Sequence, residues 1–295
     1  MQSADFLSAV FFYLKVGENL NQNWIVENLN NAFSTWNGKL GELWGLVTTG
    51  PQTFKGGAVW GVMQTLHNGM VGIGYALVVL FFAISLCKNT MNFHELKRPE
   101  AAIHYLIRFV AAKALVGYGM DIMLNVFSIC NGIVTDMANN MGGISEAMVS
   151  LPAEMQTAIE NVGFLASIPL WLVTILGSLF ITVLSFVMIL TVYGRFFRLY
   201  MYTALAPLPL AAFAGESTQS VGISFLKSYV GVCLEGAVIV LACVIYSAFV
   251  STPTVASGEA TTIVWSYLAE TVFNMLVLVG LIKGSDRIIH EMMGL

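Results

Sequence analysis

Apolar residues recur near the start of the chain at alternating steps of three and four. The stripe consists of Val26, Leu29, Phe33, Trp36, Leu40, Leu43 and Val47. This spacing places all of its members on one face of an α-helix. The opposite face is polar and rich in asparagine, as at Asn28, Asn30 and Asn31. We therefore predict an amphipathic helix, which either packs on neighbouring helices or lies in the membrane interface.

The polar face of this helix favours packing on protein. Interfacial helices usually carry many Lys and Arg side chains on their polar face, whereas this face has Lys39 among mainly uncharged residues. We therefore expect the apolar stripe to serve as an assembly face. The five residues at its centre are Leu29, Phe33, Trp36, Leu40 and Leu43.

Beyond this region the chain carries long apolar segments. A helix needs about 20 apolar residues to cross a bilayer. The sequence predicts five such spans, near residues 70–87, 101–134, 168–194, 225–250 and 263–282. The expected fold is therefore all-α and polytopic, inserted in the lipid bilayer. An N-terminal helical region over residues 1–60 is followed by a transmembrane domain over residues 61–295.

One further apolar stretch, residues 199–213, is short and is interrupted by Pro207 and Pro209. Each proline removes a backbone donor and breaks a helix. Arg198 precedes the stretch and Lys227 follows it, so both of its ends are expected on the cytoplasmic side. Because the stretch is too short to cross twice, we predict a re-entrant or membrane-buried hairpin. The alternative is a kinked ordinary span.

Composition and charge support the membrane assignment and suggest an orientation. Apolar residues make up 57% of the chain and charged residues 10%, against about 25% charged residues in soluble domains. Basic residues cluster near positions 88–98, 195–198 and 283–287, whereas loop 135–162 is acidic. By the positive-inside rule, we expect this acidic loop and the N-terminus outside the cell membrane, and the C-terminus in the cytoplasm. The net charge of −4 does not favour a broad nucleic-acid-binding surface, and no direct nucleic-acid site is evident.

Several charged residues fall inside the predicted spans. Asp121 is expected to face protein or water, because a charge in lipid is costly. Lys113, Glu235 and Glu270 fall at similar depths, near the middle of a hydrocarbon core about 30 Å thick. We predict that they form an intramembrane charge cluster. The alternatives are that each lines a water-filled passage or a seam between subunits, or that the carboxyl groups are neutral.

No motif of enzyme chemistry is recognisable. The chain lacks a phosphate-binding loop, an H-E-x-x-H motif and a G-x-S-x-G elbow. Its four cysteines have no C-x-x-C spacing, and its four histidines are scattered. We therefore predict no catalytic, cofactor or metal site, and interpret the cysteines as small buried hydrophobic residues.

The overall plan and one stretch of sequence resemble a known family. The stretch is Arg-Phe-Phe-Arg-Leu-Tyr-Met-Tyr-Thr-Ala-Leu-Ala-Pro-Leu-Pro-Leu, residues 195–210. It resembles the Arg-rich helix end and Ala-Pro-Leu segment of TrbL-like polytopic membrane subunits of conjugative type IV secretion systems, in the form found on mobile elements of Gram-positive bacteria. The resemblance implies a channel or scaffold subunit that forms a homo-oligomer, contacts other secretion-channel subunits and helps to move DNA and protein across the cell envelope.

Two other functions remain open from the sequence. A secondary transporter often has inverted repeats and paired broken helices, but only one Pro-broken segment is visible and the number of spans is odd. A stand-alone pore-forming protein is the other alternative. Co-purifying secretion subunits would favour the secretion role, and a solute-binding monomer would favour transport.

Overall fold

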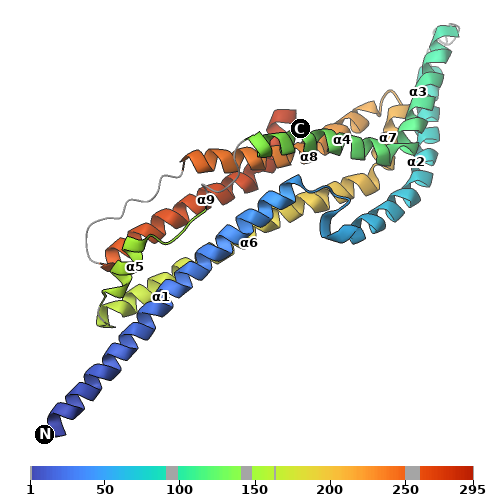
Figure 1. Ribbon diagram of the computed structural model, residues 1–295. Helices are drawn as coiled ribbons and strands as arrows, with labels where there is room; N and C mark the ends of the chain where they lie inside the picture. The colour runs from blue at the N-terminus through green and yellow to red at the C-terminus, as the bar shows by residue number, and fades with distance from the viewer. Residues whose placement is uncertain (1, 91–98, 141–147, 163, 250–259, 295) are drawn as a thin grey trace. The chain divides into compact units, whose positions relative to one another are not determined.

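The computed structural model describes residues 2–90, 99–140, 148–162, 164–249 and 260–294. Within these ranges the structure consists of helices and the turns between them, with no strand (Figure 1). The predicted all-α class is therefore confirmed. The elements are α1 Gln2–Thr48, η1 Phe54–Gly57, α2 Ala58–Thr90, α3 Pro99–Gly117, α4 Gly119–Asn140, α5 Ala153–Glu160, α6 Phe164–Leu205, α7 Pro207–Ala211, η3 Ala212–Ala214, α8 Gln219–Phe249 and α9 Ala260–Met293.

The described helices include enough long apolar segments for a multi-pass membrane protein. Four segments qualify as spans by length and hydropathy: Phe54–Lys88, Ser167–Leu205, Gln219–Phe249 and Thr262–Met293. A fifth is the pair Ile103–Gly117 and Gly119–Asn139, whose two helices are bent by 72°. The prediction of about five spans is thus confirmed.

Two of the predicted segments differ from the helices that contain them. The third span was expected to end at Gly194, but α6 continues to Leu205, because basic residues next to an apolar segment do not by themselves end a helix. The segment 101–134 is two helices, α3 and α4, that meet around Tyr118. The glycines on either side of the bend allow close packing: a Cβ on Gly117 would lie 2.7 Å from the Tyr75 hydroxyl oxygen, and one on Gly119 would lie 3.2 Å from Leu210 Cδ1.

An exposed apolar stripe follows one face of α6. It contains Leu172, Leu176, Leu179, Val183, Phe186 and Leu190. These positions recur at three- and four-residue steps, so they share one helix face. In a soluble protein an apolar face of this length would be covered by protein. Its exposure on a candidate span is what a lipid-facing surface requires.

The chain divides into two compact units. The first comprises Met1–Trp44, Gly142–Thr191 and Leu241–Lys283, and the second comprises Gly45–Met141, Val192–Val240 and Gly284–Leu295. The helices α1, α6, α8 and α9 contribute residues to both units. The domain boundary predicted at residue 60 stays a prediction.

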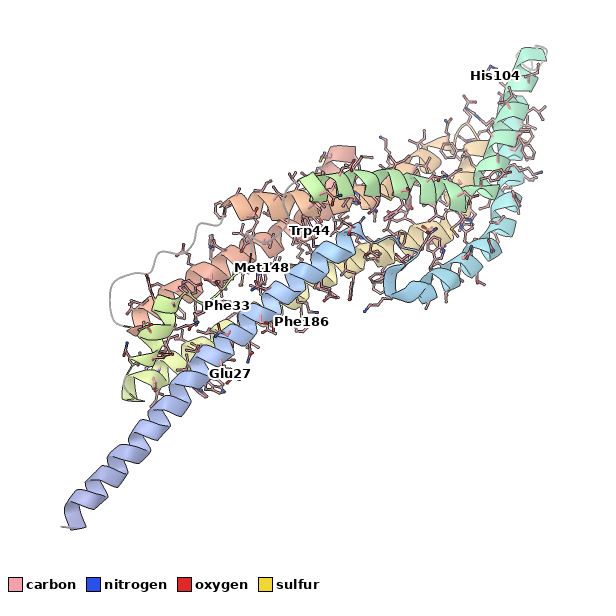
Figure 2. The ribbon with its side chains drawn as sticks, viewed as in Figure 1. Glu27, Phe33, Trp44, His104, Met148 and Phe186 are labelled. Atoms are coloured by element: carbon pink, nitrogen blue, oxygen red, sulfur yellow. The ribbon has the colours of Figure 1, made fainter. Side chains whose placement is uncertain are left out.

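In the first unit, α1 packs on helices of its own chain. Phe33 lies edge-on to Tyr267 of α9, with ring centroids 6.4 Å apart. Asn28 Nδ2 donates a hydrogen bond of 3.0 Å to Ser178 Oγ of α6. In Figure 2, Phe33 and Phe186 mark α1 and α6 where these two helices run side by side.

All five residues of the predicted assembly face are buried. Leu29, Trp36, Leu40 and Leu43 are 0% exposed and Phe33 is 2% exposed. Side chains buried to this degree hold α1 in place within the chain. Their role in assembly stays a prediction, and in this conformation they would act by positioning α1 and not by touching another subunit.

The acidic loop of the sequence is anchored to the first unit at its described end. Asn37 of α1 pairs with the backbone of Val149 through two hydrogen bonds: its Nδ2 donates to the Val149 oxygen over 2.8 Å, and its Oδ1 accepts from the Val149 nitrogen over 2.9 Å. Tyr267 Oη donates to the Ser150 oxygen over 3.0 Å. The helix α5 follows, with Met155 and Ile159 buried. One asparagine on the polar face of α1 thus fixes the loop.

In the second unit, the short helix α7 packs tightly against α2. A Cβ on Gly74 would lie 2.9 Å from Val116 Cγ1 and 3.0 Å from both Cβ and the carbonyl oxygen of Pro207. Glycine at this position therefore permits α2 to approach α3 and α7 closely. Close approach through small residues is a common way for helices to pack in a membrane, where the hydrophobic effect between them is weak.

At the break between α6 and α7, a side chain of α2 hydrogen-bonds to a main-chain carbonyl of α6. Thr203 lies four residues before Pro207, so its carbonyl would normally accept the N–H of residue 207, which a proline lacks. His67 of α2, which is 2% exposed, supplies the missing donor: its Nδ1 lies 2.7 Å from the Thr203 oxygen. Because a carbonyl can only accept, the Nδ1 of His67 carries the proton.

The packing at Gly74 yields a direct test. We expect Gly74→Leu to lower the free energy of unfolding by about 1–3 kcal/mol, since the side chain would overlap Val116 and Pro207. Gly72→Leu is the matched control in the same helix, because no heavy atom lies within 4 Å of a Cβ at that position. Thermal unfolding in detergent measures both. Equal stability of the two variants would contradict the close approach of α7 to α2.

Candidate functional site

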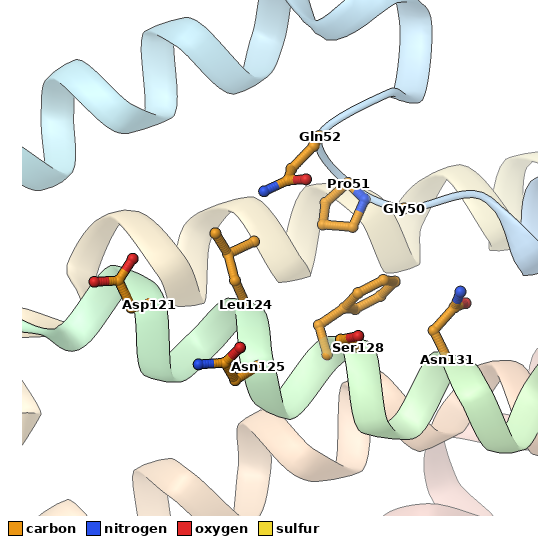
Figure 3. A pocket seen from close by; sticks show the side chains of 9 residues that line it. Gly50, Pro51, Gln52, Asp121, Leu124, Asn125, Ser128 and Asn131 are labelled. Carbon is orange, nitrogen blue, oxygen red and sulfur yellow. The ribbon is translucent and has the colours of Figure 1, made fainter.

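A polar cleft lies along one face of α4 in the second unit. Asp121, Asn125, Ser128 and Asn131 recur at steps of four, three and three, so they share a helix face. Together with Gly50–Gln52 of the segment after α1, they line a cleft of about 500 Å³ (Figure 3). Asp121 carries the one full charge among its lining side chains.

Three side chains hold the segment that forms the other wall of the cleft. Arg195 Nη1 donates to the Val47 oxygen over 3.3 Å, and Asn131 Nδ2 donates to the Thr48 oxygen over 3.2 Å. These carbonyls belong to the last turn of α1, where helix carbonyls lack a backbone donor. Tyr200 Oη donates to the Pro51 oxygen over 2.8 Å. The wall is therefore fixed through its own backbone.

Arg195 is completely buried, with 0% of its side chain exposed. Besides the bond to Val47, its Nε donates to the Val232 oxygen over 3.4 Å and its Nη2 donates to the Cys233 oxygen over 3.3 Å. A Cβ on Gly236 would lie 2.8 Å from Arg195 Nη1. Glycine at this place in α8 thus leaves the room that the guanidinium occupies.

Aromatic rings pack on the turn that leads from the cleft wall to α2. Phe54 stacks on Phe196 with centroids 4.0 Å apart and meets Tyr193 edge-on at 5.5 Å. The backbone is left-handed at Lys55 and Gly56, whose φ angles are 52° and 71°. Lys55 Nζ lies 5.3 Å from the centre of the Tyr193 ring. The rings therefore anchor a strained turn next to the cleft.

A second arginine of α6 forms an ion-pair network with α8 and α9. Arg198 Nη2 lies 2.7 Å from both carboxylate oxygens of Glu235, and Arg198 Nη1 donates to Asp286. Ser285 Oγ donates to Glu235 over 3.2 Å. Glu235 is 1% exposed, and its buried carboxylate is therefore both paired and hydrogen-bonded, as a buried charge must be.

The predicted charge cluster of Lys113, Glu235 and Glu270 stays a prediction, and Glu235 has a different partner within its own unit. Lys113 and Glu270 are exposed, and Glu270 belongs to the other unit. Glu235 pairs with Arg198. The position of a residue along a helix fixes its depth but not the direction in which its side chain points. Arg198 was assigned to a helix end, whereas α6 runs past it.

Pro207 and Pro209 both lie in α7, which has five residues. A helix of this length is too short to cross a bilayer, which needs about 20 residues. Pro207 is buried, as are Leu210 and Ala211. The re-entrant position of this segment in the membrane stays a prediction.

The cleft can bind water and donor groups, but it does not present a nucleophile beside a base. Its one carboxylate accepts hydrogen bonds, and its neutral amide and hydroxyl groups can both donate and accept them. Among the residues that the structure describes, no group of three or more His, Cys, Asp or Glu side chains could hold a metal ion. The polar spacing of α4 was visible in the sequence. The burial of Arg195 and its carbonyl partners was not, because main-chain partners leave no residue signature.

The sequence model of a family described as "TrbL/VirB6 plasmid conjugal transfer like protein" matches residues 36–207, more than half of the chain. The matched part includes the cleft residues, Arg195 and Arg198, and it ends at Pro207. No curated protein and no solved structure matches the chain.

The ion pair of Arg198 and Glu235 can be measured by a double-mutant cycle. We expect Arg198→Met and Glu235→Gln to show a coupling energy of about 1–3 kcal/mol in thermal unfolding, because the pair is buried on the Glu235 side. The exposed pair Arg287–Glu291, whose side chains are 86% and 66% exposed, is the control, with a coupling of about 0.5 kcal/mol or less.

A second cycle tests whether Lys113 also pairs with Glu235. Lys113→Met and Glu235→Gln should be additive, because Glu235 contacts Arg198 instead. Coupling between Lys113 and Glu235, with additivity between Arg198 and Glu235, would restore the pairing predicted from the sequence.

Proposed function

Because the chain belongs to the TrbL/VirB6 plasmid conjugal transfer-like family, we propose that it is a membrane subunit of a conjugative type IV secretion system that moves DNA and protein across the cell envelope. The family match over residues 36–207 carries this proposal. The chain is a multi-pass membrane protein by its apolar helices, as such a subunit must be. The family is a structural component of the secretion machinery, and the proposal gives no residue a catalytic role.

We further propose that the polar cleft contributes to a hydrated path through the assembled channel. Polar side chains in membrane segments usually face protein or water, and they often mark a pathway. Asp121, Asn125 and Ser128 form such a face on α4, which is half of a bent candidate span. A homo-oligomer with other secretion subunits would surround this path. The buried network around Arg195 supports the scaffold that holds the cleft open.

The proposed orientation follows the distribution of charge. In this orientation the protein lies in the cell membrane. Its N-terminus and loop 135–162 are outside the cell, and its C-terminus is in the cytoplasm. Five spans agree with termini on opposite sides. The turn between α6 and α8 then lies on the cytoplasmic side, near Arg198.

Transfer of the mobile element from donor cells tests the function. Cells that lack this chain should lose transfer, and the parent chain should restore it. Asp121→Ala should restore it about tenfold less well, because a charge on a polar membrane face usually serves function. Asp136→Ala is the matched control, an exposed acid on the same helix that does not line the cleft.

The outcomes of this test separate the two levels of the proposal. Unchanged transfer without the chain would overturn the secretion role. Full activity of Asp121→Ala at equal protein level would remove the cleft from the path but leave the secretion role intact. Purification in mild detergent adds a second readout, since a monomer that binds a solute would favour a transporter.

Cysteine labelling tests the orientation. We expect Ser150→Cys to react with an impermeant thiol reagent from outside intact cells, whereas Ser217→Cys should react only after the cells are opened. Both side chains are exposed, and a Cys87→Ser background removes the one exposed natural thiol among the four cysteines. Ser217 is preferred to Thr218, whose hydroxyl donates to the Ala212 oxygen over 2.7 Å.

Labelling of position 217 from outside would place the turn between α6 and α8 on the outer face and reverse the proposed orientation there. Ser257, between the predicted spans 225–250 and 263–282, lies outside the described residues and offers an independent position for the same measurement.

A further inference from the structure

Lys113 is a single cation on an apolar helix face of the second unit. It is exposed on α3, in one half of the bent candidate span. Leu106 and Val110, seven and three residues before it, are 59% and 56% exposed and lie on the same side of the helix. Among the described residues of this unit, none of the ion pairs includes Lys113. A face that suits lipid therefore carries one cation.

Glu270 occupies a comparable position in the first unit. It is exposed on α9, within the candidate span Thr262–Met293. Phe273, three residues further along, is 59% exposed and lies next to Glu270 on the helix surface. Among the described residues of this unit, no ion pair includes Glu270. A second apolar face therefore carries one anion.

Both charges lie deep in the bilayer in the proposed orientation. Twelve helical steps separate residue 113 from residue 101, and residue 270 from residue 282, at the cytoplasmic ends of the two predicted spans. This is roughly 18 Å of helix in a hydrocarbon core about 30 Å thick. A lysine can extend its long stem toward the membrane surface, whereas the stem of a glutamate is much shorter. Since an ion in hydrocarbon is costly, Glu270 in particular needs a partner at its own depth.

We propose that Lys113 of one copy of this chain pairs with Glu270 of a second copy, inside the membrane, where the two apolar helix faces meet. The inference rests on the homo-oligomer of the proposed function. Opposite charge and similar depth favour this occupant, because a second copy brings a carboxylate to Lys113 and an ammonium group to Glu270. An anionic lipid headgroup can meet Lys113 at the membrane surface, but it offers no cation to Glu270 in the middle of the core.

The pair determines which faces meet and in which register. Apolar side chains gain little by leaving lipid for another apolar surface, so the apolar rows alone do not select a partner. A buried ion pair adds little net stability, but the loss of one partner leaves the other unpaired and is strongly destabilising. Like charges placed opposite each other disfavour a wrong register. The two charges therefore act as a specificity device at the subunit interface.

Charge reversal in two differently tagged chains tests the pair. Alone, Lys113→Glu and Glu270→Lys should each associate at least about tenfold more weakly than the parent, because like charges then meet at the interface. When the two chains are co-expressed they should form mixed oligomers, because each substituted side chain meets an opposite charge on the other chain. Native mass spectrometry of the full chain in mild detergent measures the stoichiometry, and a pull-down through one tag measures the mixing.

Conservative variants and cross-linking separate this effect from a loss of folding. Lys113→Arg and Glu270→Asp keep the charges and should assemble like the parent. Glu160→Lys, at an exposed acid of α5 in the first unit, is the control for a reversed charge away from the spans and should also assemble. In a Cys87→Ser background, Lys113→Cys in one tagged chain and Glu270→Cys in the other should be joined by a bifunctional maleimide into a covalent dimer that carries both tags.

The inference is overturned if both reversed variants assemble with the parent stoichiometry, or if the parent itself is a monomer. It is also overturned if one chain with both reversals assembles while the mixture of the single variants does not, because the pair would then lie within one chain. These readouts do not involve transfer of the mobile element. Transfer that persists in cells without the chain would therefore remove the secretion role and leave the pair in place.

Discussion

A guanidinium group without access to water must be given hydrogen-bond acceptors by the protein, and Arg195 finds three of them on main-chain carbonyls. One belongs to the end of α1 and two belong to the middle of α8. Removing one acceptor would leave the buried guanidinium short of a hydrogen-bond partner, which is costly. The end of α1, the part of α6 around Arg195 and the middle of α8 are therefore held in one arrangement. The need for glycine at 236 and one of the bonds that hold the wall of the cleft follow from the place that this one side chain takes.

Charged residues within the candidate spans therefore have two distinct roles in the second unit. Arg195 and Glu235 are buried, Arg198 is half-buried, and the three join helices, with their charges met by carbonyls or by one another. Asp121 faces a cleft with amide and hydroxyl neighbours. The first three residues hold the helices together, whereas Asp121 belongs to a polar surface that water can wet. This separation fits a subunit that both builds a membrane complex and borders a hydrated space.

Periodicity revealed those features that depend on one helix at a time. The stripe of α1 and the apolar spans were visible because a buried or lipid-facing side recurs at a helical step. Features that depend on two helices were not visible. The partner of Glu235 required the direction in which Arg198 points, and the bend between α3 and α4 required Tyr75 and Leu210 to lie against its glycines. The bond between His67 and Thr203 was likewise not visible, because only the folded chain brings His67 next to the carbonyl that Pro207 leaves without a donor.

The bond from His67 to the Thr203 carbonyl has a mechanical consequence. Elsewhere in α6 successive turns are tied by several main-chain bonds at once, so bending the helix strains all of them together. At Pro207 one of those ties is replaced by a single side chain from another helix. Such a bond has a net worth of about 1 kcal/mol. The direction that α7 takes after α6 is therefore set from outside α6, by the contacts of both helices with α2 at His67 and at Gly74.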